Sequence, residues 1–360
     1  MRKGTMKTFL RMASIFLLVG TAAHAASGYH VLKTIKISDP GNSWDYAGAD
    51  NANRHIFISH GPQLEVIDAD SDQVIGKIVA PGVDFSKPES LDGMNVRGAT
   101  AAADLGRGFM PSAKDNSISI FDLKTLKVLT VVKVGQNPDG YAYDPATHRG
   151  FTFSNREPKG ATAVDIAEGK VAGTVSLSGK PEAAAADGQG HMFVNIEDKD
   201  LVTKFNSRTL QVEANWPTAP CQEPASMAID AKNHRLFVGC RGKAPVMLVM
   251  NTDSGNVITS LPIGDGTDAA VFDPQTRMIF SSNGGAGTLT VIQQESADKY
   301  KVADTVKTEP GARTMALDLK THKIYLINAD RKPAAPAAAG ERPARPEVLA
   351  DTFRVLVVGR

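Results

Sequence analysis

Charged and polar residues recur at a regular spacing along this 360-residue chain. Seven equivalent positions, 42 to 52 residues apart, begin short apolar runs, and six of them are charged: Asp45, Arg97, Asp139, Glu182, Asp268 and Arg313, with Ala225 as the seventh. The ends of the runs that follow are mostly polar and include His60, Asn283 and Asn328. Carboxylates, guanidinium groups and amides together can hold a small polar ligand or a peptide. Whether they meet depends on the elements that position them.

The repeat that carries these residues is clearest in Gly135–Leu177. This stretch contains four short apolar runs separated by turn residues, which predicts four antiparallel strands joined by hairpins. In six copies an aromatic residue follows the first position by twelve residues, and in the copy at Glu182 by eleven. A period of about 40–45 residues with four strands is typical of propellers. The sequence therefore predicts an all-β, seven-bladed β-propeller of four-stranded antiparallel blades.

The seventh copy has three recognisable strands, the last being Phe353–Gly359. Residues 31–37 (VLKTIKI), near the N-terminus, resemble the fourth strands of the other copies. We therefore expect the N-terminal strand to complete the C-terminal blade and close the ring. Closure removes the exposed edges that an open array of sheets would have.

The propeller prediction brings the polar positions together. In this fold the first strand of each blade lines the central channel, so its opening residue and the end of the second strand lie on one face. We interpret nine residues as a ligand-binding set: Asp45, His60, Arg97, Asp139, Glu182, Asp268, Asn283, Arg313 and Asn328. In this hypothesis Arg97 and Arg313 hold an anionic group, and the acids receive hydrogen-bond donors. Alternatively, acids and arginines pair across blades and tie the ring together.

Residues 1–25 have the pattern of a cleaved secretion signal. Four basic residues precede the apolar run IFLLVG, and Ala-His-Ala at 23–25 fits the small-x-small cleavage rule. We therefore expect a periplasmic or secreted protein. The run is shorter than the ~20 residues that a membrane span requires, so no span is expected. Without the signal the chain has 40 − 4 = 36 basic and 39 acidic residues, a net charge of −3.

The remaining chain, residues 26–360, is predicted to be one propeller domain with insertions at about 81–94 and 330–352. The second insertion is rich in proline and alanine and is expected to be extended. It is either a surface loop or a lid over the axial opening. We expect the protein to be a monomer.

Cys221 and Cys240 are the only cysteines. An even number of cysteines in an exported chain predicts a disulfide. In a hairpin that turns near residues 232–233, Ala225 would lie opposite Cys240, and Cys221 only four residues further along the same edge. Two free thiols are the alternative. There is no CxxCH motif, so covalent c-type haem is excluded, and we expect no cofactor and no bound metal.

Five histidines occupy the predicted turn between the first and second strands of different blades: His55, His148, His191, His234 and His322. Residues that repeat with the blade are expected to serve the blade, and positions spread around a ring cannot converge on one ion. No GxSxG, HExxH or Walker motif occurs. No catalytic residue is therefore predicted.

The blade motif resembles that of the YVTN-repeat, YncE-like seven-bladed propellers. Residues 144–151 (DPATHRGF), 273–280 (DPQTRMIF) and 318–325 (DLKTHKIY) carry the first half of the motif, and 122–135 and 251–264 carry the second half. The resemblance extends over essentially all of residues 26–360. It implies an exported propeller and transfers no catalytic residues, because the shared motif builds blades rather than a site.

These patterns favour a binding protein that recognises a small polar ligand or a protein partner on its axial face. The alternative is an enzyme, since some seven-bladed propellers are lactonases or related hydrolases that use axial acids. Here Arg97 and Arg313 interrupt the acids, which disfavours that alternative. Binding of single-stranded nucleic acid is weaker still. It requires a basic groove with stacking aromatics, whereas this chain has a net charge of −3 without its signal and 6% aromatic residues.

Overall fold

The computed structural model of the chain describes residue 1 and residues 27–38, 43–87, 96–333 and 347–360. The predicted signal sequence therefore lies outside the described residues except for Met1, as do residues 88–94 and 334–346 of the two predicted insertions. None of the helices in the described part of the chain has the length and apolar character of a membrane span.

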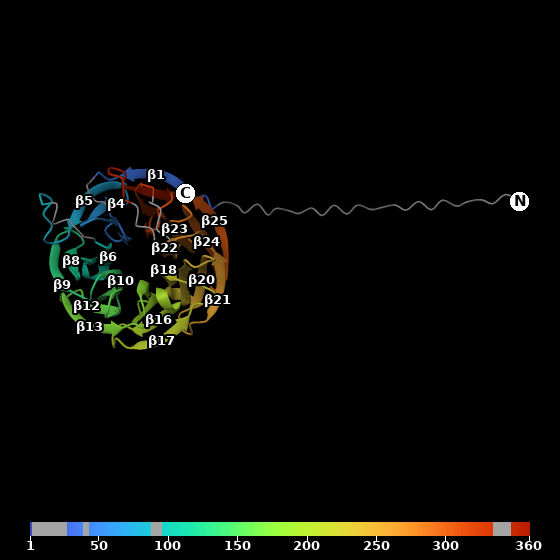
Figure 1. Cartoon of the computed structure of the whole chain (residues 1–360), viewed down its shortest axis with the longest axis horizontal. Helices are drawn as coiled ribbons and strands as arrows, with labels where there is room; N and C mark the ends of the chain where they lie inside the picture. Colours follow the sequence, from blue (N-terminus) through green and yellow to red (C-terminus); the bar gives the residue numbers. More distant parts are fainter. Residues whose placement is uncertain (2–26, 39–42, 88–95, 334–346) are drawn as a thin grey trace.

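Seven four-stranded antiparallel sheets stand in a ring, which confirms the predicted seven-bladed propeller (Figure 1). Blade 1 contains β2 (Ala47–Asp50), β3 (His55–His60), β4 (Gln63–Asp68) and β5 (Gln73–Val79), and blade 2 contains β6 (Thr100–Ala102), β7 (Arg107–Ser112), β8 (Ser117–Asp122) and β9 (Val128–Lys133). Blade 3 contains β10 (Pro138–Asp144), β11 (Arg149–Ser154), β12 (Gly160–Asp165) and β13 (Lys170–Ser176). Blade 4 contains β14 (Pro181–Ala186), β15 (His191–Ile196), β16 (Leu201–Asn206) and β17 (Val212–Pro217).

Blade 5 contains β18 (Pro224–Asp230), β19 (Arg235–Cys240), β20 (Val246–Asn251) and β21 (Val257–Pro262). Blade 6 contains β22 (Thr267–Asp273), β23 (Met278–Asn283), β24 (Thr288–Ser296) and β25 (Lys299–Lys307). Blade 7 contains β26 (Met315–Leu317), β27 (Ile324–Asn328), β28 (Arg354–Gly359) and β1 (His30–Lys36). Within the described residues, three short 3-10 turns connect consecutive strands: η1 (Ala103–Leu105), η2 (Glu197–Lys199) and η3 (Ala231–Asn233).

Aromatic side chains at one position of every second strand build the core between blades. All seven are fully buried: Phe57, Phe109, Phe151, Phe193, Phe237, Phe280 and Tyr325. Phe57 of blade 1, for example, meets Phe121 of blade 2 edge to face, with ring centroids 5.5 Å apart. Burying such a side chain stabilises a fold by roughly 1.5–3 kcal/mol. Blade packing therefore explains the twelve-residue spacing in the sequence.

The N-terminal strand closes the ring as predicted. β1 pairs antiparallel with β28, from His30 opposite Gly359 to Lys36 opposite Arg354, so the last blade contains both ends of the described domain (Figure 1). Apolar residues that flank β1 secure it. Tyr29 packs edge to face on Phe280 at 5.1 Å, and Ile37 is buried in the cluster that contains Phe353.

Some of the turn histidines adopt a conformation that explains their recurrence. His148, His234 and His322 have φ angles of 55°, 58° and 61°, in the left-handed region that histidine tolerates better than β-branched residues. Acids lie close to their rings, such as Asp273 Oδ2 at 2.6 Å from His322 Nδ1. These residues therefore serve the turns on the rim opposite the first-strand openings.

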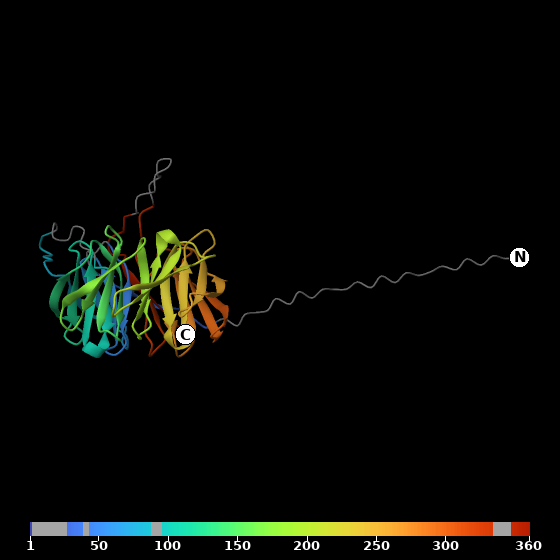
Figure 2. The same cartoon turned by 90° about the horizontal axis from the view of Figure 1, so that it is seen from below.

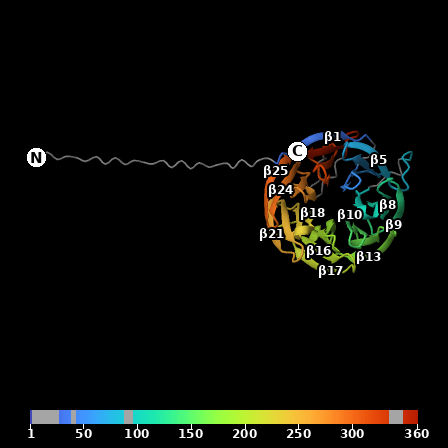
Figure 3. The ribbon, with the colours of Figure 1, turned by 180° about the vertical axis from the view of Figure 1, so that it is seen from behind.

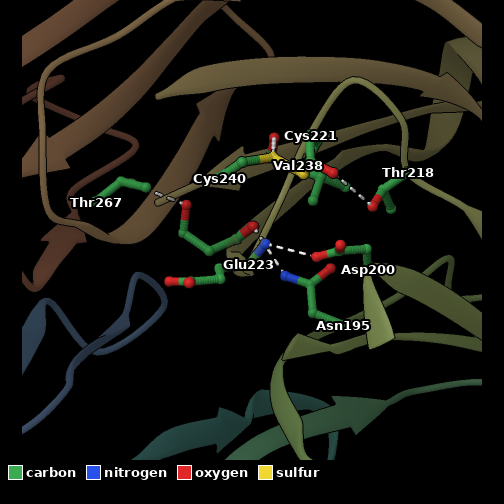
Figure 4. The surroundings of a disulfide bond; sticks show 9 residues. Asn195, Asp200, Thr218, Cys221, Glu223, Val238, Cys240 and Thr267 are labelled. Carbon is green, nitrogen blue, oxygen red and sulfur yellow. Dashed lines mark hydrogen bonds between the residues drawn. A yellow bond between two sulfur atoms is a disulfide. The ribbon is translucent and has the colours of Figure 1, made fainter. Parts of the chain in front are cut away.

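Cys221 and Cys240 form a disulfide in the structure, with their Cα atoms 5.6 Å apart (Figure 4). The bond links the segment that enters blade 5 to the end of β19. The register differs by one residue from the sequence expectation, because Pro224 rather than Ala225 lies opposite Cys240. A bulge between Pro224 and Ser226 accounts for the difference.

The first strands of the blades crowd around the axis, and Figure 3 shows β10 and β18 on the inner circumference. Two glycines permit this close approach. A Cβ on Gly48 would lie 1.8 Å from the carbonyl oxygen of Ala99, and one on Gly140 would lie 2.2 Å from that of Glu182. Small residues therefore bring the openings of neighbouring blades, and the charged side chains there, within reach of one another.

The described ends of both insertions rise from a single face of the ring (Figure 2). This is the face where the first strands begin and the second strands end, because one insertion follows β5 and the other joins β27 to β28. The base of the second insertion is ordered by the bridge between Arg331 and Val348 and by the hydrogen bond from Leu349 N to the carbonyl of Asp330, 2.8 Å long.

Candidate axial site

Six of the nine predicted site residues meet around the axis as ion pairs. On one side, Arg97 Nη1 lies 2.6 Å from Asp45 Oδ2 and 3.6 Å from Asp139 Oδ1. On the other side, Arg313 Nη1 lies 2.8 Å from Asp268 Oδ2, and its Nη2 lies 3.8 Å from Asp45 Oδ1. Asp45 is therefore flanked by both arginines. Both have carboxylate partners within the protein, which is the arrangement expected of ties between blades.

Arg241 is a member of this ring that the sequence interpretation missed. It follows β19 in blade 5, whose opening residue is the uncharged Ala225. Its guanidinium pairs with Asp268 and lies 3.6 Å from Glu182 Oε1 and 3.0 Å from Glu197 Oε1. The same side chain donates a 2.8 Å hydrogen bond from Nε to the carbonyl of Thr267. Arg241, which directly follows the second strand of blade 5, thus supplies the charge that Ala225, the opening residue of the first strand, lacks.

Two further residues of blade 4 complete the ring. Lys180, just before β14, lies 3.3 Å from Glu182 Oε2 and also pairs with Glu197. Glu197 begins the η2 turn directly after β15. Lys180 lies two residues before Glu182, and Glu197 directly follows the end of β15, so only this closeness to the repeat positions could have indicated them from the sequence. We call the nine residues the axial ring: Asp45, Arg97, Asp139, Lys180, Glu182, Glu197, Arg241, Asp268 and Arg313.

Ion pairs of the axial ring join six of the seven neighbouring pairs of blades. The exception among the described residues is the junction of blades 3 and 4, where Asp139 and Glu182 are the neighbouring members. Asp139 accepts a 2.7 Å hydrogen bond from Asn155 Nδ2. Glu182 is only 7% exposed, and its Oε2 accepts no hydrogen bond of good geometry within the described residues despite its ion-pair contact with Lys180.

The charges at this junction are unfavourable in the folded protein. Burial, followed by the charge of Asp139, raises the pKa of Glu182 to about 7. Burial and the charge of Asp45 likewise raise the pKa of Asp139, although Arg97 opposes them. Loss of hydration and repulsion between like charges both favour the neutral carboxyl. The junction is therefore an acidic gap in an otherwise alternating ring.

The other three predicted site residues are occupied within and between blades. His60 is fully buried, its ring stacked on Phe353 with centroids 3.9 Å apart, and its Nδ1 lies 3.3 Å from Glu65 Oε1. Asn283 donates a 2.8 Å hydrogen bond to Thr290 Oγ1, and Asn328 donates one of the same length to Glu309 Oε2. The structure thus uses these side chains for packing and internal hydrogen bonds.

A cavity of about 320 Å³ lies in the axial channel, and residues from all seven blades line it. Its wall is made mainly of alanine, glycine and methionine, together with Tyr46 and Tyr141. The two tyrosine rings meet edge to face with centroids 5.9 Å apart. Burial, then the charges of Glu182 and Asp139, raise the pKa of Tyr46 well above its usual range. The Tyr46 hydroxyl therefore stays protonated and can donate a hydrogen bond.

The site combines the charged groups of the axial ring with a largely apolar cavity wall, which Asp268 also lines. Such a combination orients a small molecule by its polar end and buries the remainder. Within the described residues, no cluster of three or more histidine, cysteine, aspartate or glutamate side chains has the arrangement of a metal site.

In comparisons with known proteins, no protein-family model and no curated protein matches this chain. Solved structures do match its fold. A chain of the hydrazine synthase from Kuenenia stuttgartiensis superposes with a TM-score of 0.67 at 13% identity, over 81% of this chain and 94% of that one. A chain of a mitotic checkpoint complex superposes with a TM-score of 0.69 at 12% identity, over 97% and 99% of the two chains. At such identities the similarity shows the propeller fold alone.

Proposed function

We propose that this protein is an exported binding protein that recognises a small polar ligand or a protein partner at its axial face. The axial ring carries the proposal. All seven blades contribute to it, its members differ in chemical type from blade to blade, and it adjoins a cavity of about 320 Å³. Alternating acids and cations would suffice to tie the blades together, but the junction of Asp139 and Glu182 has no ion pair between its two members and contributes nothing to such ties. Variation at one equivalent position is what an asymmetric ligand requires.

The geometry favours binding over hydrolysis. A propeller hydrolase needs axial acids that are available to a substrate or a metal. Here Asp45 and Asp268 each contact two arginines. Carboxylates held in this way are oriented, which suits recognition through charge-assisted hydrogen bonds. The proposed ligand therefore meets a preorganised surface and does not have to order it.

Export is part of the proposal. The disulfide between Cys221 and Cys240 supports an oxidising compartment, in agreement with the secretion-signal pattern of residues 1–25. The blade motif supports kinship with the YVTN-repeat propellers, for which the propeller fold is necessary but not sufficient.

The test begins with native mass spectrometry of protein isolated from the secretory compartment of its own host, to identify a retained molecule or partner. The measurement is repeated on Arg97→Ala and on Arg277→Ala, the latter an exposed arginine in the turn between β22 and β23. We expect the Arg97 variant to lose the bound species and the Arg277 variant to retain it. Equal retention by both variants, or the absence of any species bound at the axial face, would contradict the proposal.

A further inference from the structure

The axial ring contains one more carboxylate than cation, since Asp45, Asp139, Glu182, Glu197 and Asp268 face Arg97, Lys180, Arg241 and Arg313. Each of the three arginines contacts at least two carboxylates. To bind an arginine, an anionic ligand would have to displace one of those carboxylates. The displaced carboxylate would then lack a compensating positive charge. The guanidinium groups are therefore poor candidates for binding an anion.

The excess negative charge is located at the acidic gap between β10 and β14. Asp139 and Glu182 are brought together there by the close approach of Gly140 to the carbonyl of Glu182. Glu182 is more than nine-tenths buried, and although Lys180 Nζ lies 3.3 Å from its Oε2, this oxygen accepts no hydrogen bond of good geometry within the described residues. A second positively charged donor, in addition to Lys180, would stabilise a buried carboxylate oxygen in this state.

The residues that follow the acidic gap in the chain line the channel cavity. Gly140 and Ala183, which line the cavity, directly follow Asp139 and Glu182 in the chain. Tyr46 and Tyr141 line the same cavity. Aromatic faces carry negative electrostatic potential and attract cations by roughly 0.5–2 kcal/mol. The carboxylates and the tyrosines therefore both favour a positively charged ligand group.

Most of the rest of the cavity wall is apolar, although Asp268 and Thr100 also line it. Ala184, Met227 and Met315 contribute to its wall. These side chains are stabilised by contact with apolar ligand atoms but not by contact with a fully hydrophilic ligand. Its volume of about 320 Å³ lies at the lower end of the range for small-molecule sites. The occupant must be compact, with an apolar body and a cationic end.

Building on the proposed axial binding function, we propose that the ligand is a small organic amine. Its ammonium group lies between Asp139 and Glu182, and its apolar body fills the channel cavity beside Tyr46 and Tyr141. This proposal reverses the charge expected from the sequence, where Arg97 and Arg313 were assigned to an anion.

The test is titration calorimetry with the full exported chain at pH 8, where Glu182 is ionised, using three probes of one shape. These are 2-phenylethylamine, 2-phenylethanol and phenylacetate, which carry positive, zero and negative charge. We expect the amine to bind at least about tenfold more tightly than either of the others, the factor that one charge-assisted hydrogen bond provides. Tighter binding of phenylacetate, or equal binding of the alcohol, would overturn the proposal.

Three variants locate the site. Glu182→Gln and Ala184→Leu are expected to weaken amine binding about tenfold or more, the first by removing charge and the second by filling the cavity. Glu168→Gln, at an exposed acid on the β12–β13 turn, serves as the matched control. Glu182→Gln relieves a buried charge and should fold, so its result is interpretable. Amine affinity unchanged by both site variants refutes the inference.

Failure of this inference differs from failure of the proposed function. If phenylacetate binds and Arg97→Ala abolishes that binding, the axial face binds ligands but not cations. If none of the probes binds, the amine proposal is also wrong, while a retained molecule or partner that is lost in Arg97→Ala would still support axial binding. The absence of every axial ligand or partner contradicts both.

Discussion

Glu182→Gln should stabilise the protein in a strongly pH-dependent manner. Glu182 faces Asp139 across the blade junction, and Lys180, Glu197 and Arg241 also lie against it. The carboxyl has a pKa of about 7 in the folded protein against an ordinary value of 4.5. At about 1.36 kcal/mol for each pKa unit, keeping it ionised in the folded state costs about 3 kcal/mol. This value already includes the attraction of Lys180 and Arg241.

The sign follows from proton binding. Between pH 4.5 and about 7 the folded protein holds a proton on Glu182 that the unfolded chain has lost, so the free energy of unfolding falls as pH rises through this window. Glutamine resembles the protonated side chain and removes this dependence. Wild type and variant should therefore be almost equally stable near pH 4.5, and by pH 8 the variant should be more stable by up to about 3 kcal/mol.

The assay is equilibrium urea unfolding at pH 4.5, 6, 7 and 8 for wild type, Glu182→Gln and the control Glu168→Gln. The difference between wild type and Glu182→Gln should widen with pH, whereas the control should follow wild type. Parallel curves, or a variant less stable than wild type at pH 8, would refute the reasoning. The second outcome would mean that the contacts of Glu182 with Lys180 and Arg241 outweigh its burial.

Three further predictions test the ring and its closure. Arg97→Ala and Arg313→Ala should each lower the free energy of unfolding by about 2 kcal/mol, between the values for exposed and fully buried pairs; unchanged urea midpoints would argue against a role as inter-blade ties. Deleting residues 29–37 should expose the edge of β28 and cause aggregation or a large drop in melting temperature, and a deletion mutant that melts like the parent would rule out closure by β1. Replacing both Cys221 and Cys240 by alanine should cost about 3 kcal/mol by the chain-entropy relation for a loop of this length, measured by urea unfolding alongside thiol titration of the native protein, where two free thiols would disprove the bond.

The sequence alone was sufficient to predict the architecture, because the features that define it are local and repeated. The twelve-residue spacing from Asp139 to Phe151 reports a hairpin whose second strand buries an aromatic side chain, and its recurrence counts the blades. The resemblance of residues 31–37 to other fourth strands was enough to predict ring closure. The convergence of six charged openers followed from the fold, since equivalent positions in a ring lie on the same face.

Only the tertiary structure decided how these charges are used. Arg241, Lys180 and Glu197 lie beside the repeat positions, and their membership of the axial ring depends on where side chains from separate blades reach. His60 has the polar character of a site residue, yet it stacks on Phe353 from the last blade, which is distant in sequence. The acidic gap likewise depends on the close approach of β10 and β14 at Gly140. Distances between blades arise from packing of strands that are far apart in the chain, and no periodicity within one chain segment encodes them.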